Sequence, residues 1–282
     1  MTQEKEIRID ALLPNEMAAR AEYIGVRKAE APALTLIALS IMAGAFIAFG
    51  AVFSTTVSAG SSALPYGVSR LLAGFVFCLG LILVVVGGAE LFTGNNMIIM
   101  AWASKKVTTK ALLRNWGIVY IGNFIGSFGT ALLVFLSRQY TYGGGAVGET
   151  ALKIAVSKAG LGFWQALVLG ILCNTLVCLA VWMTYSARSV VDKIVAAVFP
   201  VTAFVAAGFE HSIANMYFIP YGMLIKLFDP AFVAAKAIDV SGLTVSAFLL
   251  NNLIPVTIGN IIGGAVLVAA VYWSVFLRRK DA

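Results

Sequence analysis

The sequence has few charged residues and a single histidine. Of its 282 residues, 12% are charged and 60% are hydrophobic, whereas roughly 25% of the residues are charged in a typical soluble domain. This composition excludes an ordinary water-soluble fold. One histidine, His211, excludes a metal centre with two imidazole ligands in a single chain. We expect no metal, no cofactor and no enzymatic activity. A nucleic-acid partner is also not expected, because 14 of the 20 basic residues lie where a membrane would place them.

Long apolar stretches alternate with short polar segments. A helix needs about 20 largely apolar residues to cross a lipid bilayer. Six stretches satisfy this length, and we predict spans near 33–57, 69–103, 113–137, 162–185, 194–225 and 247–276. The second and fifth are too long for one uninterrupted crossing. The sequence therefore predicts an all-α membrane protein with six transmembrane helices, of which the second and fifth are broken.

The distribution of Lys and Arg predicts the orientation. Five lie before the first span, four in 104–114, two in 186–193 and three in the C-terminal tail, against six on the other side. Because basic residues accumulate on the cytoplasmic side, both termini should be cytoplasmic. Residues 1–30 have no apolar core typical of a signal peptide. We predict instead an amphipathic helix at the cytoplasmic interface, from Pro14 to about Ala29, preceding a pore domain over 31–282.

Two segment pairs reveal an internal repeat. LLRNWGIVYIGNFIGS (112–127) and LLNNLIPVTIGNIIGG (249–264) align without a gap, and nine of the 16 positions are identical. GAELFTGN (88–95) also matches GFEHSIAN (208–215) in the same order. The repeats, about 31–138 and 160–277, hold three spans each, so the second should have inverted topology, as in many transporters. The pairs Gly122/Gly126 and Gly259/Gly263 predict close helix packing.

The two matching segments carry the only acidic residues predicted within the spans, Glu90 and Glu210. A carboxylate at this depth is costly unless it is paired or hydrogen-bonded. We expect each glutamate to stabilise a broken helix backbone through hydrogen bonds. Such breaks are tolerated where they line a cavity, and restarted helices point positive dipole ends toward it. This favours an anionic substrate, and His211 at the second break is a candidate functional residue.

AELFTGN (89–95), GFEHSIANM (208–216) and NLIPVTIGNIIGG (252–264) resemble segments of the formate/nitrite transporter family, most closely its formate-channel branch. The resemblance covers nearly the whole chain. It implies a homopentamer of aquaporin-like protomers, each with its own pore, in the lipid bilayer of the bacterial cytoplasmic membrane. The implied substrate is formate.

The resemblance also implies roles for individual residues. Leu91 and Phe204 match the family's hydrophobic constrictions. Thr93 matches a residue on the loop that breaks the second span, and His211 matches the central pore residue, next to Glu210. Other implied positions are the apolar pore-lining Phe77, Leu81 and Phe92, the polar Asn174 and Asn260 near the pore, and Lys158 at the external vestibule.

In the implied mechanism, Lys158 and the helix ends attract the anion. Desolvation then favours the neutral acid, a proton arrives through His211 or water, and the acid passes Leu91 and Phe204 while Thr93 donates a hydrogen bond. Gly94-Asn95 and the short 226–247 connection depart from the family pattern. Nitrite, hydrosulfide or another small monovalent anion are therefore alternatives. A water or glycerol pore is a more remote one, since neither break contains Asn-Pro-Ala.

Overall fold

Every regular element in residues 12–278, the part of the chain that the computed structural model describes, is helical. The elements are α1 (Pro14–Glu30), α2 (Ala33–Ser58), η1 (Ser61–Ala63), α3 (Tyr66–Gly87), α4 (Phe92–Asn95), η2 (Asn96–Ile98), α5 (Ile99–Ala103), α6 (Thr109–Leu136), η3 (Gln139–Thr141), α7 (Ala146–Ala159), α8 (Phe163–Thr184), α9 (Val190–Ala206), α10 (Ser212–Phe228), α11 (Pro230–Lys236), η4 (Ala247–Leu253), α12 (Ile254–Ile261), η5 (Ile262–Ala270) and α13 (Val271–Phe276).

The apolar helices agree with the predicted spans. Among the described residues, five helices are long and apolar enough to cross a membrane: α2, α3, α6, α8 and the continuous 247–276 segment. The number rises to six if α10 and α11, which are bent by 102°, count as one span. The first, third, fourth and sixth predicted spans coincide with these helices to within a few residues.

The two overlong stretches are broken where the sequence predicts it. The chain leaves α3 after Gly87 and restarts at Phe92, and it leaves α9 after Ala206 and restarts at Ser212. Gly88 and Gly208 follow these helix ends with φ of 73° and 77°. This left-handed conformation is accessible to glycine at little cost and commonly ends a helix.

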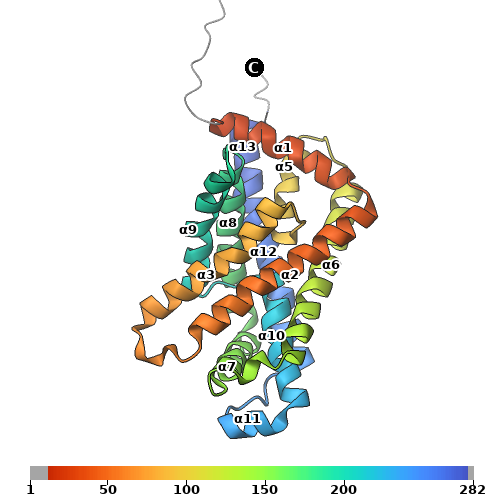
Figure 1. The fold of residues 1–282 in the computed structure, drawn as a ribbon. Coiled ribbons are helices and arrows are strands. Elements are labelled where there is room, and N and C mark those ends of the chain that lie inside the picture. Colours follow the sequence, from red (N-terminus) through yellow and green to blue (C-terminus); the bar gives the residue numbers. More distant parts are fainter. Residues whose placement is uncertain (1–11, 279–282) are drawn as a thin grey trace, which may run out of the picture.

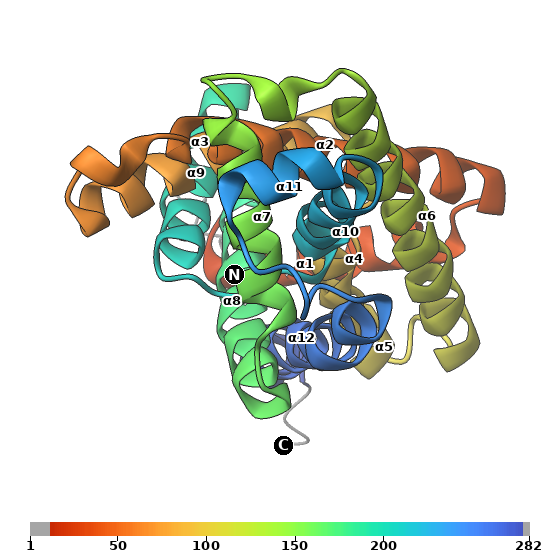
Figure 2. The ribbon, with the colours of Figure 1, turned by 90° about the horizontal axis from the view of Figure 1, so that it is seen from below.

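The short helices cover the two ends of the molecule. Helix α1 occupies the residues predicted as an N-terminal helix and lies across one end, beside α5 and α13 (Figure 1). At the opposite end lie α7 and α11, which the sequence analysis did not predict (Figure 1). In the view from that end, α10 lies between α6 and α7 (Figure 2). We call the two ends the α1 end and the α7 end.

The predicted close packing at the glycine pairs is confirmed. A Cβ on Gly126 of α6 would overlap the Ile41 carbonyl of α2, and one on Gly263 would overlap the Ile171 carbonyl of α8. The equivalent helices of the two repeats are thus packed in the same way. They differ in their internal hydrogen bonds, because 247–253 and 262–270 are π-helical whereas α6 is α-helical throughout.

Candidate functional site

The two breaks meet at the centre of the protein. Thr93 Oγ1, on α4, lies 3.0 Å from Nε2 of His211, which precedes α10. Thr93 is 0% exposed and His211 is 3% exposed. The structure therefore brings together two predicted site residues that are 118 positions apart in the sequence.

The hydrogen bonds of His211 determine its tautomer. The Ala214 N–H donates to Nδ1 at 3.1 Å, so that the imidazole caps the N-terminus of α10. A nitrogen that accepts a hydrogen bond carries no proton, and in a neutral imidazole the other nitrogen then does. Nε2–H therefore donates to Thr93 Oγ1, and the threonine hydroxyl hydrogen stays available for another acceptor.

At the first break, Glu90 is bound by side chains from α1 and α4, and α6 joins this network through Asn115. Lys28 Nζ, from α1, lies 2.8 Å from Oε1, and Asn95 Nδ2 donates to Oε2 at 2.7 Å. Asn95 Nδ2 also lies 2.9 Å from Oδ1 of Asn115 on α6, whose own Nδ2 donates to the Lys28 carbonyl at 2.8 Å. The carboxylate is thus paired and hydrogen-bonded despite its burial.

The second break repeats this arrangement. Lys158 Nζ, from α7, lies 2.7 Å from Glu210 Oε1, and Asn215 Nδ2 donates to Oε2 at 2.6 Å. Asn252 accepts from Asn215 at 2.7 Å and donates to the Lys158 carbonyl at 3.0 Å. Each carboxylate is therefore held by a lysine from the short helix at its own end.

The hydrogen bonds to the broken backbone come from asparagines instead. Asn123 Nδ2 donates to the Glu90 carbonyl at 2.9 Å and its Oδ1 accepts from the Phe92 N–H at 2.9 Å. Asn260 bonds the Glu210 carbonyl at 3.0 Å and the Ser212 N–H at 2.9 Å. The expectation that the glutamate side chains hold the backbone is therefore wrong: an amide can donate and accept at once, whereas a carboxylate can only accept.

The two lysines differ in their remaining partners. Lys28 Nζ also donates to Asn95 Oδ1 at 2.9 Å. Lys158 has no equivalent bond, because Asn215 Oδ1 is buried without a partner among the described residues. Lys158 Nζ lies instead 5.5 Å from the centroid of the Phe218 ring. The ammonium group of Lys158 therefore keeps more donor capacity for a ligand than that of Lys28.

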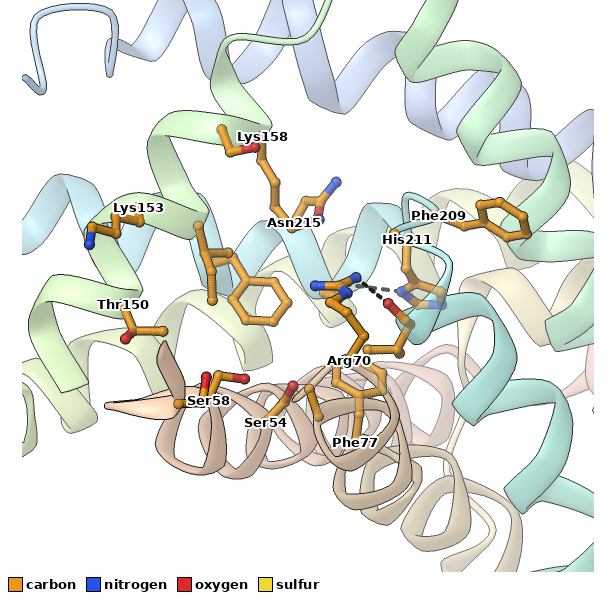
Figure 3. A pocket seen from close by; sticks show the side chains of 18 of the residues that line it. Ser54, Ser58, Arg70, Phe77, Thr150, Lys153, Lys158, Phe209, His211 and Asn215 are labelled. Carbon is orange, nitrogen blue, oxygen red and sulfur yellow. Dashed lines mark hydrogen bonds between the residues drawn. The ribbon is translucent and has the colours of Figure 1, made fainter. Parts of the chain in front are cut away.

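A cavity opens on each side of the Thr93–His211 pair. The α7-side cavity has a volume of about 730 Å³, and Lys158 and His211 extend into it (Figure 3). The α1-side cavity, of about 220 Å³, is lined by Lys28, Glu90 and Leu91 among others. Thr93 lines neither cavity. Thr93 thus lies in a buried segment between the two cavities, and His211 borders that segment on the α7 side.

Apolar side chains border this buried segment. Phe204 packs against Phe77 in an edge-to-face contact, with ring centroids 5.9 Å apart, and lies nearly parallel to the His211 ring at 6.0 Å. Both phenylalanines line the α7-side cavity. Leu91 and Leu81 line the α1-side cavity and are 2% and 3% exposed. Four of the predicted apolar residues thus border this buried segment.

The other predicted residues lie next to the pair rather than in the cavities. Phe92 packs against Trp116 and Tyr120 of α6, at 6.0 and 4.9 Å between ring centroids, and lines neither cavity. Asn174 donates to the carbonyls of Thr93 and Asn260 at 3.3 and 2.7 Å. It thereby connects the two breaks through α8.

The sequence analysis missed Lys28 and the helix that carries Lys158. A signal exists: AEYIGVRKA (21–29) and ALKIAVSKA (151–159) align without a gap and share five of nine residues. The repeat therefore extends to the short helices. The longer aligned segments also showed two matching asparagine pairs, Asn115/Asn252 and Asn123/Asn260. They did not show which groups these asparagines bond.

Comparison with known proteins identifies the family. The sequence model of the family described as formate/nitrite transporter matches residues 15–274. The chain belongs to the formate/nitrite transporter family. Its members include the formate channel FocA of Escherichia coli K12, which is 48% identical over 96% of this chain and 97% of its own length. FocA of Haemophilus influenzae is 41% identical over 91% of this chain and 92% of its own length.

Solved structures of this family have the same fold. A chain described as a pentameric formate channel with formate bound superposes with a TM-score of 0.82, at 46% identity, covering 87% of this chain and 98% of that one. A second chain, described as an ion channel of the family, superposes with a TM-score of 0.74 at 29% identity. The superposition covers 93% of this chain and 98% of that one. The chain is therefore a membrane transport protein and not an enzyme.

Proposed function

We propose that this protein is a formate channel in which formic acid crosses the buried segment between the two cavities as a neutral molecule. The observation that carries the proposal is the neutral Thr93–His211 pair, which is flanked by apolar side chains and separates two cavities that each contain a lysine. The names of the relatives and of the solved neighbour support formate as the substrate.

The proposed architecture has two inverted repeats of three spans, with both termini in the cytoplasm. The two matching glutamate networks support it, because each lysine, glutamate and asparagine of one has its counterpart in the other. Tyr120 Oη and Thr257 Oγ1, at equivalent positions of the aligned segments, lie 2.8 Å apart. A contact between equivalent positions is expected on the pseudo-twofold axis of such a repeat.

A formate anion entering either cavity first meets a cation. The α7-side cavity, external in this orientation, contains Lys158, and the α1-side cavity contains Lys28. An anion would pay a large desolvation penalty in the apolar segment, whereas the neutral acid would not. Partial desolvation at the edge of this segment favours protonation of the carboxylate.

The central pair then binds the neutral acid. The Thr93 hydroxyl, which accepts from His211, can donate its own hydrogen to an oxygen of the acid. His211 is held neutral by its helix cap, so the proton for formate comes from a hydronium ion that enters the cavity with bulk water, and a water molecule is left. Nε2–H keeps the threonine hydroxyl oriented. Leu91 and Phe204 form the two constrictions.

The active assembly is proposed to be a homopentamer. The name of the solved neighbour supports this state. Large apolar side chains on the outer surfaces of the spans, among them Phe75 (58% exposed) and Leu133 (68% exposed), provide faces for lipid and for neighbouring protomers. Each protomer would contain a complete pore, because both breaks belong to one chain.

Transport by the purified protein in liposomes tests the function. Formate uptake and internal pH are followed together, and nitrite, hydrosulfide and acetate are compared in the same vesicles. We expect formate to enter with one proton and faster than the other anions. Fast nitrite or hydrosulfide entry without formate entry would assign the alternative substrate. Stopped-flow swelling with glycerol, without anion flux, would assign a neutral-solute pore.

A further inference from the structure

The α7-side cavity contains a guanidinium group that the proposed mechanism does not use. Arg70 lies near the start of α3, and its Nε donates to the Ala206 carbonyl at 3.1 Å. Its Nη2 donates to the Val205 carbonyl. Both carbonyls belong to the last turn of α9, directly before the second break. Figure 3 shows Arg70 extending into the cavity toward His211, with Lys158 reaching in from α7.

The carbonyls at the end of α9 need a cation if anions are to pass. The last carbonyls of a helix carry a partial negative charge, and α9 ends beside His211. An anion that approaches the central pair from the α7 side would be repelled by them. The two hydrogen bonds from Arg70 cover this negative end with a positive charge. No described residue accepts from its Nη1, so the guanidinium has donors left for a ligand.

In the part of the chain that the structure describes, the other break has no such cation. There α3 ends at Gly87, as α9 ends at Ala206, but the alignment of the two breaks pairs Arg70 with Val190, which is exposed. Among the described residues, Lys28 and Glu90 are the only charged ones that line the α1-side cavity. The charged residues of the α7-side cavity are Arg70, Lys153, Lys158, Glu149 and Glu210. Among the described residues, the two breaks thus share a lysine–glutamate–asparagine pairing but differ in their further cations.

We propose that Arg70 completes an anion-binding site in the α7-side cavity, in which a small monovalent carboxylate binds between Nη1 of Arg70 and the ammonium group of Lys158. The site holds the anion before it reaches the Thr93–His211 pair. The identity of the anion, formate, and the outward orientation of the α7 end rest on the proposed function. The consequence is directional: half-saturation from the α7 side occurs at a lower concentration than from the α1 side.

The KM for formate on each side of the membrane tests this site. Right-side-out and inverted membrane vesicles from the same cells present the α7 end and the α1 end, and formate uptake is measured at equal pH on both sides. In Arg70→Gln the ratio of the KM at the α7 end to that at the α1 end should rise roughly five- to tenfold, as expected for loss of one charge-assisted hydrogen bond. In the wild type the KM at the α7 end should also rise with ionic strength, and in Arg70→Gln it should rise less.

Arg138→Gln is the matched control. Arg138 is exposed at the same end and does not line the cavity, so its loss should leave the KM ratio unchanged. If Arg70→Gln does not assemble, Arg70→Lys keeps the cation but loses Nη1, and the KM ratio should rise roughly two- to threefold. An unchanged ratio in the assembled variant would overturn the site and assign Arg70 to helix capping alone. If the wild type carries no formate, the proposed function fails, and the ratio is measured with nitrite.

Discussion

The side chains of Thr93 and His211 join the two halves of the protein, with the hydroxyl oxygen 3.0 Å from Nε2. The bond has a direction, since Nδ1 accepts the Ala214 N–H at 3.1 Å and Nε2 must therefore donate. A helix cap at one nitrogen thus orients the Thr93 hydroxyl through the other. Both functions of the imidazole depend on its remaining neutral.

Replacing His211 with Asn should reduce formate flux without unfolding α10. Asparagine is among the best N-cap residues, but it cannot place a donor where Nε2 lies. We expect a roughly tenfold lower proton-coupled flux, the effect of about one hydrogen bond, measured in liposomes between pH 5 and 8. Thr93→Val should give a similar loss, and the double variant little more, because both changes remove one interaction. Wild-type flux in His211→Asn across this pH range would contradict the role of the histidine.

Truncation of the constrictions should change selectivity. Leu91→Ala and Phe204→Ala remove apolar side chains that are 2% and 3% exposed. We expect entry of acetate and glycerol to rise relative to formate in the liposome assay, because the widened segment admits larger solutes and water. Phe199→Ala is the control on the same helix, since Phe199 is 77% exposed, and it should leave selectivity unchanged. Unchanged selectivity in Phe204→Ala would show that Phe204 is not a constriction.

Removal of Lys158 should destabilise the protein more than removal of its neighbour Lys153. In Lys158→Met the Glu210 carboxylate, whose side chain is 5% exposed, loses its cation, and an unpaired buried charge costs about 3 kcal/mol. Lys153 pairs with Glu149 at the surface, where the side chains are 64% and 36% exposed, so Lys153→Met should cost less than about 1 kcal/mol. Thermal unfolding in detergent measures both. Equal midpoints for the two variants would contradict a stabilising role of the buried pair.

A methyl group on Gly126 should separate α6 from α2. Its Cβ would overlap the Ile41 carbonyl and lie 2.8 Å from the Ala45 nitrogen, and overpacking of this kind costs about 1 to 3 kcal/mol. Gly129→Ala is the matched control on the same helix, because nothing lies within 4 Å of its added Cβ. We expect a lower unfolding midpoint only for Gly126→Ala. If both variants have the same unfolding midpoint as the wild type, the close approach of α6 and α2 is not required for stability.

The start of α9 should contribute stability that depends on pH. The N–H groups of Arg188 and Ser189 each donate to Oδ2 of Asp192 at 2.9 Å and hold the pKa of this carboxyl below its usual range. Because the folded-state pKa is lowered, the stabilisation is complete above the unfolded pKa of about 4 and is lost as the pH falls through the folded value. Asp192→Ala should lower the unfolding midpoint at pH 7, and its difference from the wild type should shrink toward pH 3. A difference that stays constant would contradict this origin.

The positions of the spans and breaks could be predicted from the sequence because local properties determine them. Apolar runs of sufficient length indicate helices in a bilayer, and Glu90 and Glu210 indicate interruptions because carboxylates need partners at that depth. The aligned segments 112–127 and 249–264 also predicted the equivalent packing of Gly126 and Gly263, since a small residue at a given helical spacing has the same consequence in each copy.

Only the tertiary structure decided which side chains meet. Lys28 and Glu90 are 62 positions apart, and Arg70 and Ala206 136 apart, so neither contact leaves a periodic signal in the sequence. The direction of the Thr93–His211 bond likewise follows from a backbone N–H that becomes available only when α10 begins at Ser212. The sequence by itself determined where the chain enters, breaks and leaves the apolar region, because hydrophobicity and backbone preferences act locally. The partners of its few charges depend on how distant helices pack.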